Sequence, residues 1–523
     1  EHHAGVITAQ AASLETLAIS LGNMTNSLTK VSNELHRVQY HLEVETATVN
    51  ALRSDLNMIY NSRSWRLTKP LRKLTNMRYF LRTEGFWNVL RRVHYKYLRP
   101  KPVMPHSHSA APMPEGFHAL TFPEINQPLV SIVIPVYNKY EYTFNCLKSV
   151  LANTSDVSYE VIVVDDCSTD ETPVLLKTME NITAIRNPHN SGFIHSCNTG
   201  AQAARGQYLL MLNNDTEPQP GWLMAMLDTF RDFPGAGMVG AKLLFADGTL
   251  QEAGGIVWQD ASAWNYGRQQ DANKPEYSYA REVDYCSGAC LLLPTSDYMA
   301  LGMFDTLYTP AYYEDTDLAF KVRASGKQVI YQPLARVIHF EGVSNGTDLS
   351  GGIKEYQRVN HSKFRAKWDS VLATHSPNGY LPELERERSV RKRVLIIDAQ
   401  VLMPDRDSGS LRMFNFIKVF LGLGYKVTFM PDNLQYHERY TPMLQAIGVE
   451  CQYCPYQQTI VGHLENTGRL YDVVVLSRAD YAEKNIDAVL KYCPQAYVLF
   501  DTVDLHFLRE SRAAALSVDT ALQ

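Results

Sequence analysis

The stretch SIVIPVYN at residues 131–138 is rich in β-branched residues and ends in Tyr137 and Asn138. A short apolar run of this kind is typical of a strand that is buried on both faces of a sheet. Further strand-like runs alternate with helix-like patterns and lie at residues 161–164, 208–212 and 238–239. This alternation predicts an α/β domain whose sheet is largely parallel and is covered by helices on both faces.

Residues able to bind a nucleotide stand near the ends of these runs. They are Pro135, Tyr137, Asp166, Asn213, Asn214 and Asp215. In an open parallel sheet, ligands bind at the carboxyl ends of the strands, so we expect these residues to face one crevice. A lone carboxylate such as Asp215 can hold one position of a hard divalent ion whose other ligands are diphosphate oxygens and water. Taken singly, each group is also typical of a turn, since Asn and Asp are ordinary loop formers.

An acidic cluster opens a later helical pattern. Glu314, Asp315 and Asp317 fall within four residues. Acids in a first helical turn favour the helix dipole, so a capping role fits any one of them. Repulsion between neighbouring carboxylates raises the pKa of one of them, which a general base working near neutral pH requires. His339 follows a short apolar run, and a solitary histidine of this kind is either structural or a metal ligand.

Residues 129–368 resemble the family-2 glycosyltransferases of the GT-A fold. The resemblance is strongest to the rhamnosyltransferase-like subgroup that builds bacterial O-antigen and other surface polysaccharides. It rests on six stretches that follow one another along the chain: SIVIPVYN (131–138), VIVVDDCSTDET (161–172), NNDTEP (213–218), VDYCSGACLL (283–292), YYEDTDLAFKVRASG (312–326) and VIHFEG (337–342). It implies a Rossmann-like nucleotide-diphospho-sugar transferase domain.

The resemblance also implies a role for each matched residue. Tyr137 stacks on the base of the donor, and Asp166 hydrogen-bonds to that base. Asn213 and Asn214 lie near the ribose and the diphosphate, while Asp215 and His339 ligate Mn²⁺ or Mg²⁺. Asp315 is the base that deprotonates the acceptor hydroxyl, Glu314 orients Asp315 or the acceptor, and the turn 285–288 borders the acceptor. Many relatives have an acid where Asn213 or Asn214 stands, so this metal site has less negative charge than theirs.

These roles predict an inverting, metal-dependent glycosyltransferase. A divalent cation neutralises the charge that develops on the departing nucleoside diphosphate, and a base on the opposite side of the anomeric carbon permits direct displacement. The expected donor is a dTDP-, UDP- or GDP-sugar, and the expected acceptor is a growing, lipid-linked surface glycan. Two other interpretations stay open: a coiled-coil scaffold with a decayed catalytic domain, and a nucleotidyltransferase, which shares the sheet and the use of a metal.

A second α/β unit is predicted at residues 393–523. Its strand-like runs lie at 394–397, 426–430, 473–476 and 497–500. The stretches VLIIDAQVLMPDRDSGSLR (394–412), YDVVVLSR (471–478) and FDTVDLH (500–506) resemble the amino-terminal half of a family-4 glycosyltransferase of the GT-B fold. Most donor contacts in that fold come from the other half, so we expect this unit to be incomplete and not to catalyse.

The first part of the chain follows a different pattern. From Leu14 to Ile59, apolar residues recur at steps of three and four, which predicts a coiled coil and hence a homo-oligomer. An amphipathic helix that packs on the protein's own domains is the alternative. Between Arg63 and Lys101, twelve Lys or Arg stand against one acid and alternate with aromatic residues. This composition favours the anionic surface of the inner membrane over nucleic acid or a solvated connector.

Composition sets the outer limits. The chain has 523 residues, of which 45% are hydrophobic and 20% charged, so it contains several folded domains and is not disordered throughout. Eight scattered cysteines and a start without a secretory leader predict reduced thiols and a cytoplasmic protein, peripheral on the inner membrane. The expected organisation is a coiled coil at 1–62, a membrane-proximal segment and linker at 63–127, the GT-A domain at 128–370, a linker at 371–392 and the half-domain at 393–523.

Overall fold

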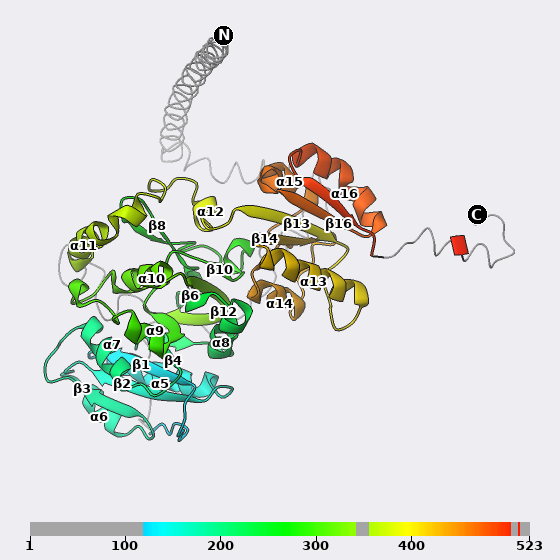
Figure 1. The fold of residues 1–523 in the computed structure, drawn as a ribbon. Helices are drawn as coiled ribbons and strands as arrows, with labels where there is room; N and C mark the ends of the chain where they lie inside the picture. Colours follow the sequence, from blue (N-terminus) through cyan, green and yellow to red (C-terminus); the bar gives the residue numbers. More distant parts are fainter. Residues whose placement is uncertain (1–118, 341–354, 504–510, 513–523) are drawn as a thin grey trace, which may run out of the picture. The chain divides into compact units, whose positions relative to one another are not determined.

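The computed structural model describes residues 119–340, 355–503 and 511–512 (Figure 1). The predicted coiled coil and the basic aromatic segment lie outside the described residues, so both stay predictions. Across these described ranges, no helix is both long enough and apolar enough to cross a membrane.

The larger sheet has ten strands. They are β1 (Val130–Val136), β2 (Tyr159–Asp165), β3 (Thr183–Arg186), β4 (Tyr208–Leu212), β5 (Thr216–Pro218), β6 (Ala236–Leu244), β7 (Leu250–Glu252), β10 (Arg281–Glu282), β11 (Cys290–Pro294) and β12 (Gln328–His339). Eight of them follow the order β10-β12-β6-β11-β4-β1-β2-β3, while β5 pairs with β12 and β7 with β6. A separate hairpin joins β8 (Gly255–Val257) to β9 (Ala263–Asn265).

The sheet is mixed, so the prediction of a largely parallel sheet is wrong around β11. The strands β4, β1, β2 and β3 are parallel, and so are β12 and β6. Strand β11, however, is antiparallel to both β4 and β6. An apolar run such as Cys290–Pro294 looks the same in either direction, because burial on both faces removes the alternation of polar residues. The reversed strand matters for function, since it brings Gly288 and Ala289 to the carboxyl end of β4, where Cys290 pairs with Leu212.

Helices cover both faces of this sheet, as the sequence predicted (Figure 1). One core contains Ile132 and Ile134 and is covered by α5 (Tyr140–Asn153), α6 (Thr172–Lys177) and α8 (Trp222–Asp232). The other core contains Val133 and is covered by α7 (Phe193–Gln202), α9 (Thr295–Ala300), α10 (Glu314–Ala324) and α11 (Glu355–Leu372). Successive residues of a strand point to opposite faces, which is why one apolar run serves two cores.

The second sheet has five parallel strands in the order β15-β14-β13-β16-β17. They are β13 (Lys392–Asp398), β14 (Tyr425–Pro431), β15 (Val449–Cys451), β16 (Val473–Ser477) and β17 (Tyr497–Asp501). The helices around it are α13 (Ser408–Gly422), α14 (Tyr440–Ala446), α15 (Ile460–Thr467) and α16 (Ala479–Tyr492). All four strand-like runs of this region are strands, and the sheet is parallel as predicted. Its resemblance to half of a GT-B enzyme stays a prediction.

The segment between the two sheets packs against the β8–β9 hairpin and its surroundings. It contains the short helix α12 (Pro382–Glu385). Nδ1 of His375 lies 2.7 Å from the carbonyl oxygen of Val257, and the N–H of Gln259 donates to the carbonyl oxygen of Ser376 at 3.0 Å. Further on, Arg388 pairs with the buried Asp284 at 3.2 Å. The segment predicted as a linker therefore contributes to the packing of the first domain.

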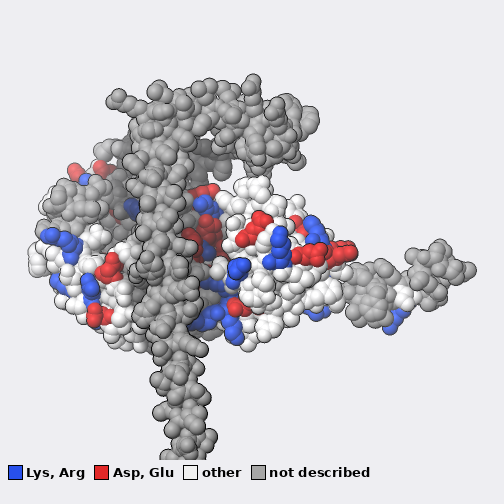
Figure 2. Space-filling model, turned by 90° about the horizontal axis from the view of Figure 1, so that it is seen from above, with Lys and Arg blue, Asp and Glu red and all other residues white. Residues whose placement is uncertain are grey.

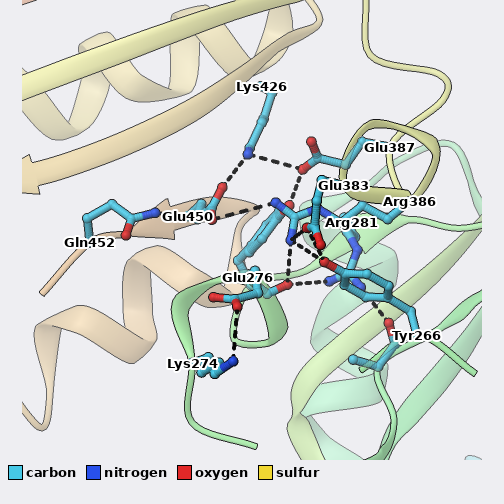
Figure 3. A network of polar contacts seen from close by, with 12 residues as sticks. Tyr266, Lys274, Glu276, Arg281, Glu383, Arg386, Glu387, Lys426, Glu450 and Gln452 are labelled. Carbon is cyan, nitrogen blue, oxygen red and sulfur yellow. Dashed lines mark hydrogen bonds and ion pairs between the residues drawn. The ribbon is translucent and has the colours of Figure 1, made fainter. Parts of the chain in front are cut away.

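Buried charged and phenolic side chains connect this segment to both sheets (Figure 3). We call them the interdomain network; its members are Tyr266, Tyr279, Arg386, Glu387, Arg393, Lys426 and Glu450. The ammonium of Lys426 contacts Glu450 and lies 3.3 Å from Glu387. Arg393 pairs with Glu387 at 2.7 Å, and the hydroxyl of Tyr279 donates to Glu387. Buried charges are stable only when they are paired and hydrogen-bonded in this way.

Arg386 extends the network toward the first domain (Figure 3). It lies 3.7 Å from Glu450 and donates to the hydroxyl of Tyr266 at 2.9 Å. Burial alone would raise the pKa of Glu387, but the charges of Lys426, Arg386 and Arg393 outweigh burial and lower it. The pKa of Glu450 is lowered in the same way, chiefly by Lys426 and Arg386. Both carboxylates are therefore held in their charged form.

Acidic and basic side chains are interspersed over the described residues that are visible in Figure 2. Such a mixture is typical of a solvated protein surface. The strongest segregation of charge in the sequence lies at residues 63–101, outside the described residues.

Candidate active site

The carboxyl ends of β2, β1 and β4 form one edge of the larger sheet. Val136 pairs with Asp165, so the residues that follow them, Tyr137 and Asp166, leave the sheet from neighbouring strands. Tyr137 is 45% exposed, which leaves its ring accessible to a planar base. Both residues line the same cavity.

Asp166 holds the segment that leads into α7. Its carboxylate accepts hydrogen bonds from the side-chain amide of Asn187 at 2.7 Å and from the N–H groups of Ser191 and Gly192 at 2.9 and 2.7 Å. Gly192 has a φ of 86°, a backbone conformation that favours glycine. Asp166 thus has a structural role in addition to the contact with a base that the sequence predicted for it.

Asp215 and His339 come from distant parts of the chain and face each other. Strand β5 begins directly after Asp215 and pairs with the end of β12, which places His339 opposite Thr216. Nε2 of His339 lies 3.3 Å from Oδ1 of Asp215. Asp215 is 5% exposed, and its Oδ1 has no hydrogen-bond partner among the described residues. The backbone ladder therefore brings together the two residues predicted to ligate a metal.

Gln251 of β7 fixes the orientation of the His339 ring. Nδ1 of His339 lies 2.8 Å from Oε1 of Gln251. An amide oxygen accepts hydrogen bonds, so Nδ1 bears the proton and the neutral ring keeps a lone pair on Nε2, the atom nearest Asp215. Metal-ligating histidines are commonly oriented by such a second residue.

The pair of Asp215 and His339 fits a divalent cation that shares its ligands with a substrate. A carboxylate oxygen and an imidazole nitrogen suit Mn²⁺, and the carboxylate also suits Mg²⁺. In the part of the chain that the structure describes, no group of three or more His, Cys, Asp or Glu is placed to hold a metal. A cation bound here would need further ligands, for which diphosphate oxygens and water stay the prediction.

The two asparagines before Asp215 differ in their contacts. The side-chain amide of Asn214 donates to the hydroxyl of Thr143 on α5 at 3.0 Å, which ties the loop to that helix. The N–H of Asn213 donates to the carbonyl oxygen of Ala289 at 3.0 Å. Its side-chain oxygen is buried and has no partner within the described ranges. Asn213 therefore offers an acceptor to a ligand, while Asn214 fixes the loop.

Asp315 opens α10 on the other side of the cavity. Its Oδ2 accepts from the N–H of Gly288 at 2.9 Å, and its Oδ1 accepts from the N–H and the hydroxyl of Thr316 at 2.6 and 3.1 Å. Tyr312 and Tyr313, just before the helix, both have left-handed backbone conformations with φ of 75° and 74°. Such conformations are costly for bulky residues and are often found at functional sites.

Burial raises the pKa values of both acids at the start of α10. The pKa of Asp315 is raised by burial, against the hydrogen bonds from Gly288 and Thr316, which lower it. The pKa of Glu314 is raised well above its usual range, first by burial and then by the charge of Asp315. Glu314 is 6% exposed, and its Oε2 has no hydrogen-bond partner among the residues that the structure describes. The sequence analysis attributed such a shift to repulsion alone, whereas burial is the larger cause.

Strand β7 contributes a buried acid that sequence analysis missed. Glu252 is fully buried, and its Oε1 accepts from the N–H of Ser287 at 2.8 Å. The next N–H, that of Gly288, binds Asp315, so two consecutive amides of one turn serve two carboxylates. A Cβ at Gly255 would lie 1.9 Å from the ring of Tyr285, so only glycine lets β8 pack against Tyr285, just before this turn. The signal in the sequence was the polar pair Gln251-Glu252 before two glycines.

One cavity of about 580 Å³ joins these groups. Its walls include Asp215 and His339, beside the paired ends of β5 and β12, and Glu314 and Asp315 at the start of α10. Pro135, Tyr137, Asp166, Asn213 and Asn214 also line it. A volume of this size is typical of a small-ligand site. The structure thus brings all the residues with a predicted role in binding or catalysis to one cavity, while those roles stay predictions. Asp317, the third acid of the cluster, lies outside the cavity and pairs with Lys367 at 2.8 Å.

The fold and this cavity define a GT-A-like domain, in which a mixed sheet presents polar residues at the ends of its parallel strands. Residues 131–286 match the model of a known family, "Glycosyl transferase family 2". This part of the chain is therefore similar to the glycosyltransferases of family 2.

Relatives in bacteria share this region at low identity. The chain is 29% identical over 242 residues to the O-antigen biosynthesis protein RfbC of Myxococcus xanthus, a match that covers 44% of this chain and 19% of that protein. It is 27% identical over 228 residues to an N-acetylglucosaminyl-diphospho-decaprenol L-rhamnosyltransferase of Mycobacterium tuberculosis, covering 38% of this chain and 73% of that protein. The chain thus spans about a fifth of the length of the first of these relatives.

A similar solved structure is that of GalNAc-T7 with UDP, GalNAc and Mn²⁺. The two chains are 16% identical, and the match covers 50% of this chain and 55% of that chain with a TM-score of 0.39.

Proposed function

We propose that the protein is an inverting, metal-dependent glycosyltransferase that moves a sugar from a nucleotide-sugar donor to a hydroxyl group of a growing surface glycan. The observation that carries the proposal is that the Asp215–His339 pair and Asp315 line the same cavity. Direct displacement needs a group that receives the leaving diphosphate and a base that faces the incoming hydroxyl. The Asp215–His339 pair provides the first of these groups and Asp315 the second.

Binding of the donor begins at the carboxyl ends of β1, β2 and β4. The exposed ring of Tyr137 stacks on the base. Asp166 accepts a hydrogen bond from the imino N–H of the base while it holds the 187–192 segment in place. The unpartnered side-chain oxygen of Asn213 accepts a hydrogen bond from a ribose hydroxyl. Asp215 and His339 lie beyond it, where the diphosphate ends and the sugar begins.

The metal would be held by Oδ1 of Asp215 and Nε2 of His339. A divalent cation there supplies positive charge against the departing diphosphate without any transfer of a proton. The protein orients these two atoms. The pairing of β5 with β12 places Asp215 beside His339, and the hydrogen bond from Nδ1 to Gln251 fixes the ring of His339.

Asp315 acts as the general base. Three hydrogen bonds from Gly288 and Thr316 fix the plane of its carboxylate. Burial raises its pKa, which makes it a stronger base than an exposed aspartate. The proton of the acceptor hydroxyl moves to a carboxylate oxygen of Asp315 as that hydroxyl attacks the anomeric carbon from the side opposite the diphosphate, so the configuration inverts. Glu314 lies beneath Asp315 and orients it or the acceptor.

The acceptor class rests on the relatives. Those named above are an O-antigen biosynthesis protein and a rhamnosyltransferase that acts on a diphospho-decaprenol sugar. A bacterial surface polysaccharide on a lipid diphosphate is the acceptor class that we infer for this chain, with rhamnose as one candidate sugar. The inner-membrane location and the homo-oligomer rest on residues 63–101 and 1–62 and stay predictions.

The direct test is a screen of the purified full chain with Mn²⁺ against dTDP-, UDP- and GDP-sugars. We expect one donor to raise the melting temperature by several degrees, because a ligand at 100 times its Kd stabilises by about 2.7 kcal/mol. EDTA or Asp215→Ala should abolish the shift, whereas Asp297→Asn, which changes an acid outside the cavity, should leave it intact. The same donor should then release its nucleoside diphosphate, slowly alone and faster with an acceptor glycan.

Two outcomes would replace the proposal. Release of pyrophosphate from a nucleoside triphosphate and a sugar phosphate would identify a nucleotidyltransferase. A complete lack of donor binding with Mn²⁺ would favour the non-catalytic scaffold.

A further inference from the structure

The walls of the cavity are acidic on both sides of the place where a donor sugar must lie. Five carboxylates line it, namely Asp166, Asp215, Glu252, Glu314 and Asp315. The described lining residues include neither lysine nor arginine. In a cavity this buried, Coulomb interactions are stronger than in bulk water, so the charge on a ligand strongly affects its binding.

Several acceptor atoms of the walls are also buried without a partner in the described part of the chain. Two of them, Oδ1 of Asn213 and Oδ1 of Asp215, are assigned above to the ribose and the cation, and the third, Oε2 of Glu314, is left to the sugar. A buried acceptor that receives no hydrogen bond lowers stability, so a ligand gains affinity by bringing a donor to it. Sugar hydroxyls donate hydrogen bonds, while an ionised carboxylate on a sugar only accepts them.

Under the proposed mechanism the donor ring has one possible position. The diphosphate leaves toward Asp215 and His339, and the acceptor arrives beside Asp315. The ring in between therefore faces the acids at the start of α10 together with Glu252, whose carboxylate binds the same 287–288 turn as Asp315.

We propose that the enzyme selects neutral sugars and rejects uronic acids, because the walls that enclose the transferred ring are acidic and require hydrogen-bond donors. This inference rests on the proposed glycosyltransferase function and specifies its substrate class. The divalent cation balances the diphosphate, and the acidic wall at the sugar end then excludes a further negative charge on the donor.

The test compares nucleotide sugars that differ only at C6 of the sugar. The pairs are UDP-glucose with UDP-glucuronic acid, UDP-galactose with UDP-galacturonic acid and GDP-mannose with GDP-mannuronic acid. Calorimetry with the full chain and Mn²⁺ should show the neutral member of a bound pair binding about 100-fold more tightly. This factor corresponds to one like-charge contact at about 6 Å with an effective dielectric constant of about 20.

A substitution of Glu252 separates charge from shape. Glu252→Gln keeps an oxygen that can accept from the N–H of Ser287 but removes the charge. The ratio of the two dissociation constants within a pair should therefore fall about tenfold. Glu282→Gln is the matched control, since Glu282 lies on β10 and is not among the residues that line the cavity. It should leave the ratio unchanged.

The outcomes distinguish the two claims. If both members of a pair bind within threefold of each other, or if the uronic acid binds more tightly, the selectivity is overturned while the glycosyltransferase function stands. If no nucleotide sugar binds with Mn²⁺, the proposed function fails and the selectivity fails with it. If the difference in affinity within a pair persists in full in Glu252→Gln, the acidic wall is not its cause.

Discussion

The interdomain network and the catalytic cavity both bury several carboxylates, yet they treat them in opposite ways. In the network, Glu387 and Glu450 contact lysine and arginine, and the pKa values of both acids are lowered. In the cavity, burial raises the pKa values of Glu314 and Asp315, and the hydrogen bonds recorded for them come from backbone amides and a hydroxyl.

This difference separates a structural from a functional use of buried charge. A buried acid that is matched by cations is fixed in one protonation state and stabilises a single arrangement of the chain. A buried acid without a cation lowers the stability of the protein. Its pKa is raised toward neutral pH, where a group that exchanges a proton is useful in catalysis. Buried carboxylates thus have raised pKa values in the cavity and lowered pKa values in the interdomain network.

The largest expected effect is on catalysis by Asp315. Asp315→Asn should lower kcat by about 100- to 10,000-fold, the range for loss of a general base, with donor affinity changed by less than about threefold. Because the base works only when ionised, activity of the unmodified enzyme should fall as pH drops through the raised pKa. Steady-state transfer assays across pH, paired with calorimetry of the donor, measure both quantities.

The control for Asp315 is Asp297→Asn. Asp297 is also an aspartate in the first turn of a helix, but it pairs with Lys327 at 2.5 Å and lies outside the cavity. Its substitution should leave kcat unchanged. Retained turnover in Asp315→Asn would remove Asp315 from the role of base.

The next effect is on stability of the network. Lys426→Met removes the cation shared by Glu387 and Glu450, which should lower the free energy of unfolding by about 3–5 kcal/mol because two buried acids lose a partner. Lys327→Met removes a partly exposed pair and should cost less than about 1 kcal/mol. Denaturant unfolding measures both free energies. Similar losses in the two variants would show that the network stabilises the protein no more than a partly exposed ion pair does.

A third effect concerns the orientation of His339. Gln251→Leu removes the acceptor of the Nδ1 proton, so the affinity for Mn²⁺ in the presence of a nucleoside diphosphate should fall about 10- to 100-fold. Gln251→Glu retains an acceptor at that position and should restore most of the affinity. Calorimetry without turnover gives the measurement. Unchanged affinity in Gln251→Leu would mean that Gln251 does not orient a metal ligand.

The smallest effect is a gain of stability in the cavity. Because the folded-state pKa of Glu314 is raised, the unmodified protein loses stability as pH rises from the ordinary glutamate value through that raised pKa. Glu314→Gln lacks this loss and should be more stable at pH 8 by about 0.5–2 kcal/mol. Glu387 has the opposite sign, since its lowered pKa gives stability that is lost as pH falls. Unfolding curves at pH 5 and pH 8 test the sign for Glu314, and curves at pH 5 and pH 3 test the sign for Glu387.

Much of the fold could be predicted because buried strands have a clear local pattern. The runs at 130–136 and 208–212 match β1 and β4 in full, and the four runs of the second unit are all strands. The direction of β11 and the full length of β12 were missed. A strand such as Cys290–Pro294 has no local feature that distinguishes parallel from antiparallel pairing, because its neighbours are determined by distant segments.

The residues at the ends of strands could be predicted for a similar reason. Asp166 and Asp215 follow apolar runs directly, so their place at the sheet edge follows from the strand itself. Gln251 and Glu252 could not be found this way, because β7 is a strand of three residues whose position depends on pairing with β6. The same reason explains why repulsion was predicted as the cause of the raised pKa of Glu314, whereas burial is the larger cause. Spacing in the sequence shows that two charges are close, but burial depends on the tertiary structure.

The packing of residues 375–388 on the β8–β9 hairpin has a practical consequence for anyone who wishes to isolate the catalytic domain. A truncation after residue 370, the predicted end of the GT-A domain, would remove the contacts of His375 and Arg388 with Val257 and Asp284. It would also separate Tyr266 and Tyr279 from the charges that they bind. An expression product that retains the whole second sheet, from β13 to β17, keeps these partners and also keeps β16 beside β13.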